Sequence, residues 1–177
     1  MGDPRLRLRA GEVDLEGDDA FPAEDRQLHL RLERFRAEHG FGRAISAPQI
    51  GVAKRFIALN LDGQATTMVN PEITWMSKER FALWDDCMSF PDLLVRVSRY
   101  RSISVRFTDA QGVAQHWERL PADLSELLQH EIDHLDGILF FERLPKAKRE
   151  AFLEENRAEL ARMQKEARAL LKELSQG

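Results

Sequence analysis

Residues 129–137 read Gln-His-Glu-Ile-Asp-His-Leu-Asp-Gly and contain the pattern H-E-x-x-H inside a predicted helix. Two histidines four residues apart lie on one face of an α-helix, about one turn from each other. The imidazoles of His130 and His134 can therefore reach one metal ion, with Glu131 beside the metal-bound water as a general base. The stretch predicts a metal-dependent hydrolase whose third ligand and substrate cleft come from elsewhere in the chain.

The composition is that of a globular enzyme rather than a nucleic-acid-binding or membrane protein. The chain has 177 residues, 43% of them hydrophobic and 32% charged, which is enough for one domain with a sizeable core. A net charge of −4 gives no electrostatic basis for binding nucleic acid. There is no apolar run of about 18 residues and no apolar signal-peptide core after Met1. We therefore expect a cytoplasmic protein that does not enter a membrane.

The pattern of apolar residues predicts an α+β domain. Leu28, Leu32 and Phe35 lie at helical spacing and Gly40 follows as a stop signal, which predicts a helix over 25–39. The order helix, strands, helix indicates that the H-E-x-x-H helix packs across antiparallel sheets. Strands are predicted over 55–60, 67–70, 93–100, 102–107 and 113–120, a turn over 109–112 and the metal-binding helix over 121–137.

A last predicted helix begins at Pro145 and runs to about Leu174. Leucines 153, 160 and 174, with Ala167, repeat every seven residues along it, as in a weak coiled coil. The helix either docks on its own domain or is partly exposed, or it forms a dimer or partner seam, so a monomer and a homodimer both remain open. We divide the chain into a catalytic domain over 1–144 and a charged helical extension of it over 145–177.

Cys87 is the single cysteine and cannot form an intramolecular disulfide. A lone cysteine is usually a small buried hydrophobic residue. A helix that offers two histidines to a metal still needs a soft or anionic partner, however. Cys87 is therefore also a candidate metal ligand.

Three short motifs in a fixed order resemble those of the peptide deformylase family. The family's G-x-G-Φ-A-A-x-Q, in which Φ is apolar, corresponds to GRAISAPQ at 42–49, and its E-G-C-Φ-S to DDCMS at 85–89. Its Q-H-E-x-D-H-Φ-x-G is intact at 129–137. The N-terminal residues 3–7 and an Asn-Pro-Glu turn at 70–72 are also similar to that family.

The resemblance implies an enzyme that removes the formyl group from N-formylmethionyl peptides, including nascent chains at the ribosome, and releases formate. Glu131 would take a proton from the metal-bound water and pass it to the leaving amine. The side-chain amide of Gln49 and the backbone N–H of Met88 would stabilise the oxyanion, although Gln49 could instead merely cap the segment after it. The family favours Fe(II), and the same ligands accept Zn(II), Ni(II) or Co(II). The implied ligands are Cys87, His130 and His134, with Gln129 and Asp133 behind them to orient the helix or an imidazole.

The second motif departs from the family next to the candidate ligand. Asp85 replaces a glutamate and is expected to pair with Arg99, while Asp86 replaces a glycine. Aspartate tolerates the left-handed conformation, so Asp86 adds a carboxylate without breaking the loop. Leu94 stands where the family often has a peptide-holding arginine, and we expect its side chain and that of Arg96 to face opposite ways.

The expected methionine pocket is also altered. Ala44 replaces the second glycine of the first motif, and Arg43 replaces an apolar residue. Glu126 stands one helical turn before the first histidine, where the family presents an apolar wall. Glu126 either pairs with Arg43 across the pocket mouth or belongs to a capping box that begins at Asp123. The candidate substrate-binding residues are Arg43, Ala44, Asp86 and Glu126.

Two alternatives to a methionine-specific deformylase stay open. A polar pocket lining penalises an apolar side chain, so the enzyme could act on a different, more polar formylated substrate. A catalytically silent paralogue that keeps its metal and binds a partner through 145–177 is the second alternative. Retention of Glu131 and Gln49 argues against a silent protein, since a purely structural site has no use for them.

Overall fold

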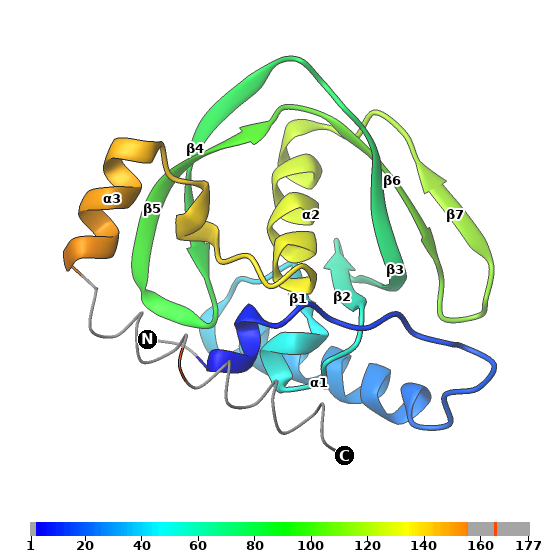
Figure 1. The fold of residues 1–177 in the computed structure, drawn as a ribbon. Helices are drawn as coiled ribbons and strands as arrows, with labels where there is room; N and C mark the ends of the chain where they lie inside the picture. Colours follow the sequence, from blue (N-terminus) through cyan, green and yellow to red (C-terminus); the bar gives the residue numbers. More distant parts are fainter. Residues whose placement is uncertain (1–2, 156–164, 166–177) are drawn as a thin grey trace.

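The computed structural model describes residues 3–155 and 165, and two antiparallel sheets lie around helix α2 in it (Figure 1). The mixed fold of helices and antiparallel sheets that the sequence predicts is therefore confirmed. The helices are α1 (Phe21–His39), α2 (Ala122–Leu135) and α3 (Lys146–Glu155), and the 3-10 turns are η1 (Pro4–Arg7), η2 (Ala47–Ile50) and η3 (Phe140–Arg143). The strands are β1 (Ala44–Ser46), β2 (Phe56–Leu61), β3 (Gln64–Met76), β4 (Arg80–Cys87), β5 (Phe90–Tyr100), β6 (Ile103–Thr108) and β7 (Ala114–Trp117).

The strands form one large sheet and one two-stranded sheet. The five-stranded sheet has the order β1-β2-β3-β6-β7, and β4 pairs with β5 in the smaller sheet. These pairings are antiparallel, and β6 and β7 form the hairpin predicted around residues 109–112, where Gly112 N donates to Asp109 O at 3.0 Å. Strand β1 is an edge of the large sheet, and its first residue, Ala44, lines the cleft described below.

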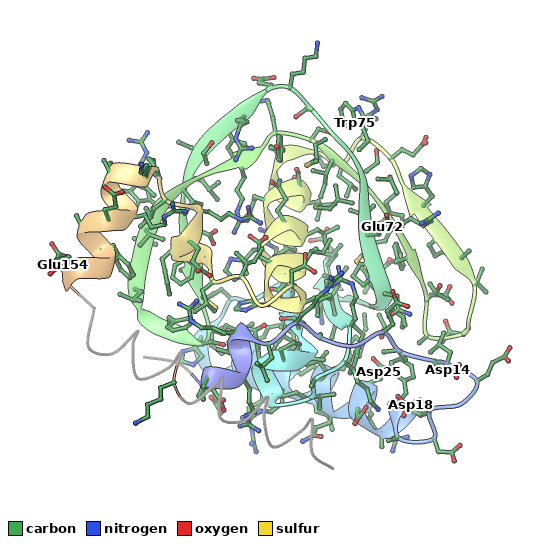
Figure 2. All side chains as sticks on the ribbon, in the orientation of Figure 1. Asp14, Asp18, Asp25, Glu72, Trp75 and Glu154 are labelled. Atoms are coloured by element: carbon green, nitrogen blue, oxygen red, sulfur yellow. The ribbon has the colours of Figure 1, made fainter. Side chains whose placement is uncertain are left out.

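Helix α1 ends at the predicted residue, His39, and begins at Phe21, four residues before its predicted start. Its buried face carries Leu28 and Leu32. Gly40 follows it in the left-handed region with φ 78°, which glycine adopts without strain. Pro22 lies in the first turn, where its fixed φ suits a helix start. The loop before α1 carries Asp14 and Asp18 at the edge of the molecule (Figure 2), and Asp18 pairs with Lys54 at 2.6 Å.

The turn expected at Asn70-Pro71-Glu72 is a bulge inside one long strand, so that expectation was wrong. Strand β3 continues to Met76, with a register shift between Val69 and Glu72 and with Asn70 at φ 50°. Asparagine tolerates this left-handed conformation, and its side chain is held by Val13, whose N–H donates to Oδ1 at 2.9 Å. A proline fits a strand at such a bulge because no ladder hydrogen bond is required of it there.

Strand β4 was missed by the sequence pattern. Its residues alternate in burial, and the inward face ends in Asp85 and Cys87, so the apolar signal of an ordinary strand is broken by a carboxylate. The expectation that Leu94 and Arg96 face opposite ways was also wrong. Residues two apart on a strand share a face, and both side chains are exposed on β5.

Helix α2 is buried along most of its length. From Leu128 to Leu135 each residue is buried, and α2 contacts β1, β5 and η2. Its apolar side chains join the core of the five-stranded sheet, and side chains fill the space around the helix (Figure 2). Polar groups in this part of α2 therefore need partners within the protein, because water does not reach them.

The predicted C-terminal helix is present over Lys146–Glu155. The heptad leucine 160, Ala167 and leucine 174 lie outside the described residues, so the division at residue 145 and the role of the extension stay predictions. Among residues 3–155 and 165, no helix is long and apolar enough to cross a membrane.

The N-terminal segment locks the end of α2. Ala10 N donates to Leu135 O at 2.8 Å, and Gly137 has φ 71° against the backbone of Arg7. A Cβ added to Gly137 would lie 2.7 Å from Arg7 O, a distance that carbon does not tolerate. Gly40 has a similar φ of 78°, yet nothing in the described part of the chain lies within 4 Å of the same Cβ position.

These two glycines separate backbone strain from steric clash. We expect Gly40→Ala to lower the free energy of unfolding by about 1–2 kcal/mol, the strain of a left-handed alanine. Gly137→Ala should lower it by at least about 1 kcal/mol more, because the N-terminal segment must also move. Urea unfolding of both variants measures the difference. Equal losses would contradict the close packing of Arg7 on the end of α2.

Candidate metal centre and cleft

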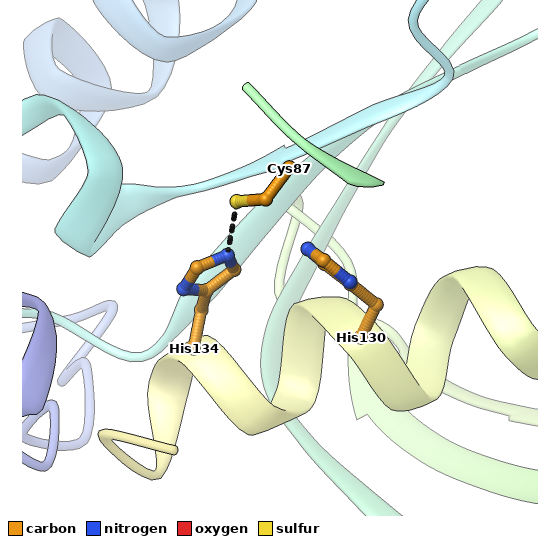
Figure 3. Close-up of side chains that lie close together, drawn as sticks. All are labelled: Cys87, His130 and His134. Carbon is orange, nitrogen blue, oxygen red and sulfur yellow. Dashed lines mark hydrogen bonds between the residues drawn. The ribbon is translucent and has the colours of Figure 1, made fainter. Parts of the chain in front are cut away.

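Three buried side chains converge at the carboxyl end of α2. His130 and His134 project from successive turns of that helix, and Cys87 reaches them from the end of β4 (Figure 3). The ligand atoms of the three residues lie within 4.8 Å of one another, and Cys87 Sγ is 3.1 Å from His134 Nε2. All three are at most 7% exposed. This is the residue set that the family resemblance implies as metal ligands.

The orientation of His130 is held by the carboxylate of Asp85. His130 Nδ1 lies 2.9 Å from Asp85 Oδ1, so Nε2 remains as the ring atom available to a metal. Arg99 donates from Nη2 to the other oxygen of Asp85 at 2.9 Å, and the pairing expected between these two residues is present. Asp85, although shorter than the glutamate of the family motif, therefore orients the imidazole of His130.

A second carboxylate, that of Asp133 on α2, extends this network of hydrogen bonds. Asp133 accepts from Arg99 and from Arg143 of η3, whose Nε lies 3.0 Å from Asp133 Oδ2. Gln129 clamps the same helix to β5, since it accepts from Tyr100 N at 2.9 Å and donates to Tyr100 O at 2.8 Å. Gln129 and Asp133 therefore orient the helix as expected. Arg143 was not foreseen, because it belongs to no motif.

Burial and neighbouring charges shift the pKa values of these groups in different directions. Burial opposes the charged form of His130, but the hydrogen bonds and charges of Asp85 and Cys87 together outweigh it and raise the His130 pKa well above its usual value. Burial, with His130 beside it, lowers the pKa of His134 well below its usual value. Burial alone would raise the pKa of Asp85, yet His130 and Arg99 lower it, so this carboxylate stays ionised.

Glu131 faces the same region from α2. It is 3% exposed, and its Oε2 is buried without a hydrogen-bond partner among the described residues. Burial raises the pKa of its carboxyl group, while His130 and Ser46 partly offset that effect. A buried carboxyl with a raised pKa and a free oxygen suits a group that takes up and returns a proton.

The two ends of the Gln49 side-chain amide have different roles. The carbonyl oxygen makes structural hydrogen bonds, and the nitrogen faces the triangle formed by Cys87, His130 and His134. Its Oε1 accepts from Ser46 N at 2.8 Å and from Ser46 Oγ at 3.0 Å, which caps η2. Its Nε2 donates to Ser89 Oγ at 3.2 Å and lies 3.8 Å from Cys87 Sγ. The capping alternative and the oxyanion role therefore involve different atoms and are compatible. Sequence reasoning overlooked Ser46, which stands where the family motif has alanine.

A cleft of about 360 Å³ opens beside the triangle and contains the four candidate substrate-binding residues. Arg43 Nη2 lies 2.5 Å from Glu126 Oε1, so these two side chains pair across the cleft. The capping alternative for Glu126 was wrong, because Pro121 is the N-cap of α2 and no side chain caps it. Ala44 is buried on β1, and Asp86 is exposed on β4. The cleft is lined by Arg36, Gly40, Phe41, Gly42, Arg43, Ala44, Gln49, Asp85, Asp86, Cys87, Met88, Glu126, Leu127, His130 and Glu131.

The other three histidines lie elsewhere. His29 is 2.8 Å from Thr67 Oγ1, and His116 is 3.2 Å from Thr74 Oγ1. His39 stacks on Phe35 with ring centroids 4.3 Å apart. None of them reaches the three candidate ligands, in agreement with the expectation that they are surface or satisfied histidines.

The polypeptide deformylase family model matches residues 1–150 of the chain. The peptide deformylase of Thermus thermophilus is 44% identical over an alignment that covers 99% of this chain and 96% of that protein. The peptide deformylase of Thermotoga neapolitana is 34% identical, with 84% and 87% covered.

Solved structures agree with this match. A crystal structure of the peptide deformylase from Thermus thermophilus has a TM-score of 0.75 and 41% identity, covering 94% of this chain and 95% of that one. A peptide deformylase from Synechococcus elongatus in complex with actinonin has a TM-score of 0.71 and 27% identity, covering 87% and 81%.

The contact between Asp85 and His130 can be tested by metal affinity. We expect Asp85→Asn to weaken Zn(II) binding about 10- to 100-fold, because the imidazole loses its orienting carboxylate. Competition with a chromophoric chelator measures the affinity. Asp109→Asn is the matched control, since Asp109 holds the β6–β7 turn and its neighbour Gln115, away from the triangle. Equal affinities of the two variants would exclude a role of Asp85 at the triangle.

Proposed function

Because this chain belongs to the polypeptide deformylase family, we propose that it hydrolyses the N-terminal formamide of N-formylmethionyl peptides and releases formate. The observation that carries the proposal is the buried triangle of Cys87, His130 and His134, with Glu131 on the wall of the same cleft. We propose nascent chains as the natural substrates and the cytoplasm as the location of the activity. The enzyme is a hydrolase of linear amides.

The chemistry of the triangle fits a single divalent metal ion. One thiol and two imidazoles are the donors that Fe(II), Zn(II), Ni(II) and Co(II) accept, and the family resemblance favours Fe(II). His134 Nε2 lies 3.1 Å from Cys87 Sγ, so this ring nitrogen is the one that faces the other candidate ligands. A divalent ion held by Cys87, His130 and His134 would supply a Lewis acid that lowers the pKa of water to about 7.

Glu131 is the proposed proton carrier. As the water oxygen bonds to the formyl carbon, the Glu131 carboxylate takes a proton from that water. As the C–N bond breaks, the same carboxyl group passes the proton to the departing nitrogen, so formate and a free amine leave. The raised pKa that burial produces at Glu131 brings proton uptake and release closer to neutral pH.

Gln49 and the backbone N–H of Met88 are the proposed donors to the developing oxyanion. Two hydrogen bonds from Ser46 fix the Gln49 carbonyl, so the amide cannot flip and Nε2 stays turned towards Cys87. Fixed donors require no reorganisation as charge develops, and each can contribute roughly 3 kcal/mol in the transition state. Met88 lies on the cleft wall directly after the cysteine.

Formate release tests the proposal directly. Anaerobically purified protein loaded with Fe(II) or Ni(II) should release formate from formyl-Met-Ala-Ser, and Glu131→Ala should lower kcat at least about 100-fold. The variant should keep its metal, as measured by elemental analysis, because Glu131 is not a ligand. Glu118→Ala, an exposed change on the β7 side, is the control. Metal loss in Glu131→Ala would point to a structural role, and no release by the wild type would favour the silent paralogue.

The Arg43–Glu126 pair supports a second candidate substrate. It places two charged groups in a cleft that would otherwise offer an apolar wall. Burial raises the pKa of Glu126 and so opposes its ionised form. With the pair intact, the aliphatic stems can still contact a methionine side chain. If the pair opens, each charge favours a first residue of opposite sign. The alternative enzyme is therefore a deformylase for formylated peptides with a polar first residue.

Substitutions at this pair distinguish the two substrates. Arg43→Ile with Glu126→Ile should raise kcat/KM for formyl-Met-Ala-Ser roughly tenfold, since a dry apolar wall replaces a polar one. Arg43→Ile alone leaves Glu126 unpaired and should favour formyl-Lys peptides, and Glu126→Ile alone should favour formyl-Glu peptides. Unchanged preferences in all three variants would remove the pair from the substrate pocket. Wild-type turnover that is faster on a charged first residue would establish the second candidate.

A further inference from the structure

A second cavity, of about 300 Å³, lies between β3, the β4–β5 sheet, α2 and η3. It shares no lining residue with the catalytic cleft. Nothing in the proposed reaction uses it. Its lining residues are Ile73, Met76, Arg80, Ser98, Arg99, Tyr100, Gln129, Asp133 and Arg143.

Positive charge predominates around this cavity. Three arginines line it against one carboxylate, that of Asp133. Asp133 pairs with both Arg99 and Arg143, and Arg99 also pairs with Asp85, which does not line the cavity. Arg80 has no carboxylate partner among the described residues. The chain as a whole carries a net charge of −4, so this local excess is not a property of the whole surface.

One buried guanidinium N–H at the cavity, that of Arg99 Nε, lacks an acceptor in the described part of the chain. Arg99 is 2% exposed, and its Nε is buried without a hydrogen-bond partner there. A buried donor left unpaired costs free energy, which a ligand oxygen or water at this position would recover.

Arg80 is exposed at the cavity, and contacts with β5 hold its guanidinium there. It donates from Nε to Ser98 Oγ at 3.1 Å and from Nη2 to Ser98 O at 2.7 Å. Its guanidinium also stacks on Tyr100, 4.1 Å from the ring centroid. Because these contacts use only two of its five N–H groups, the rest remain for a ligand. A guanidinium held in one place loses little entropy on binding an anion.

We propose that this cavity is a binding site for a small oxyanion of the phosphate class. Clustered guanidinium groups match the geometry of phosphate oxygens and form short, charge-assisted hydrogen bonds with them. The cavity volume is at the lower end of ligand sites, which fits a small anion rather than a peptide. The proposal does not depend on the deformylase activity, because the two sites share no lining residue.

Calorimetric titration of inorganic phosphate into the metal-loaded protein, at constant ionic strength, tests this site. We expect Arg80→Gln to weaken phosphate binding about tenfold or more, because a charge-assisted hydrogen bond is lost. Arg119→Gln is the matched control, since Arg119 also stacks on an aromatic ring, 3.4 Å from the Trp75 centroid, and does not line the cavity. It should bind phosphate as the wild type does.

Two outcomes would overturn the proposal. One is the absence of phosphate binding to the wild type. The other is wild-type affinity in Arg80→Gln, which would place the phosphate at the metal or elsewhere. Thermal unfolding without phosphate checks that both variants are folded. Neither outcome bears on formate release, so failure of this site and failure of the proposed enzyme activity are distinguishable.

Discussion

The structure depends on one buried guanidinium, that of Arg99 on β5, which lies between the carboxylates of Asp85 on β4 and Asp133 on α2. All three side chains are almost completely removed from water. Removing a charge from water is costly, and a buried pair that loses one partner is typically destabilised by about 3–5 kcal/mol. The three groups therefore require one another, and they join the two-stranded sheet to the metal-binding helix.

The same contacts position the chemistry. Arg99 uses one oxygen of Asp85, and the other oxygen forms the hydrogen bond with His130 Nδ1. The strand that carries Asp85 ends two residues later, at Cys87. One strand thus supplies a candidate ligand and the group that orients another ligand. The carboxylate behind the imidazole stays ionised because its neighbours are cationic. Stability and the geometry of the triangle therefore rest on the same hydrogen bonds, and a change in either strand or helix would affect both.

In the cleft, as around Arg99, most buried charges lie next to a charge of opposite sign. Asp85 is compensated from behind by Arg99, and Glu126 is compensated across the cleft by Arg43. Among the described residues of the cleft wall, Glu131 keeps a buried oxygen without a partner, as expected of the group that must exchange a proton. At the second cavity the imbalance has the opposite sign, because three arginines line it with one carboxylate, that of Asp133, which pairs with Arg99 and Arg143.

The sequence by itself determined the parts whose signal is local. Helical spacing with a glycine stop predicted α1, and the spacing of His130 and His134 placed both on one face of α2. The three motifs identified the family and the residues that converge. Contacts between distant segments left no local pattern: β4 was missed because a carboxylate interrupts its buried face, and the full length of β3 because its bulge resembles a turn. Only the tertiary structure decided that Glu126 pairs with Arg43 instead of capping α2, and that Arg143 joins Asp133. These pairings depend on which side chains are brought together in a dry interior, and sequence spacing does not encode that.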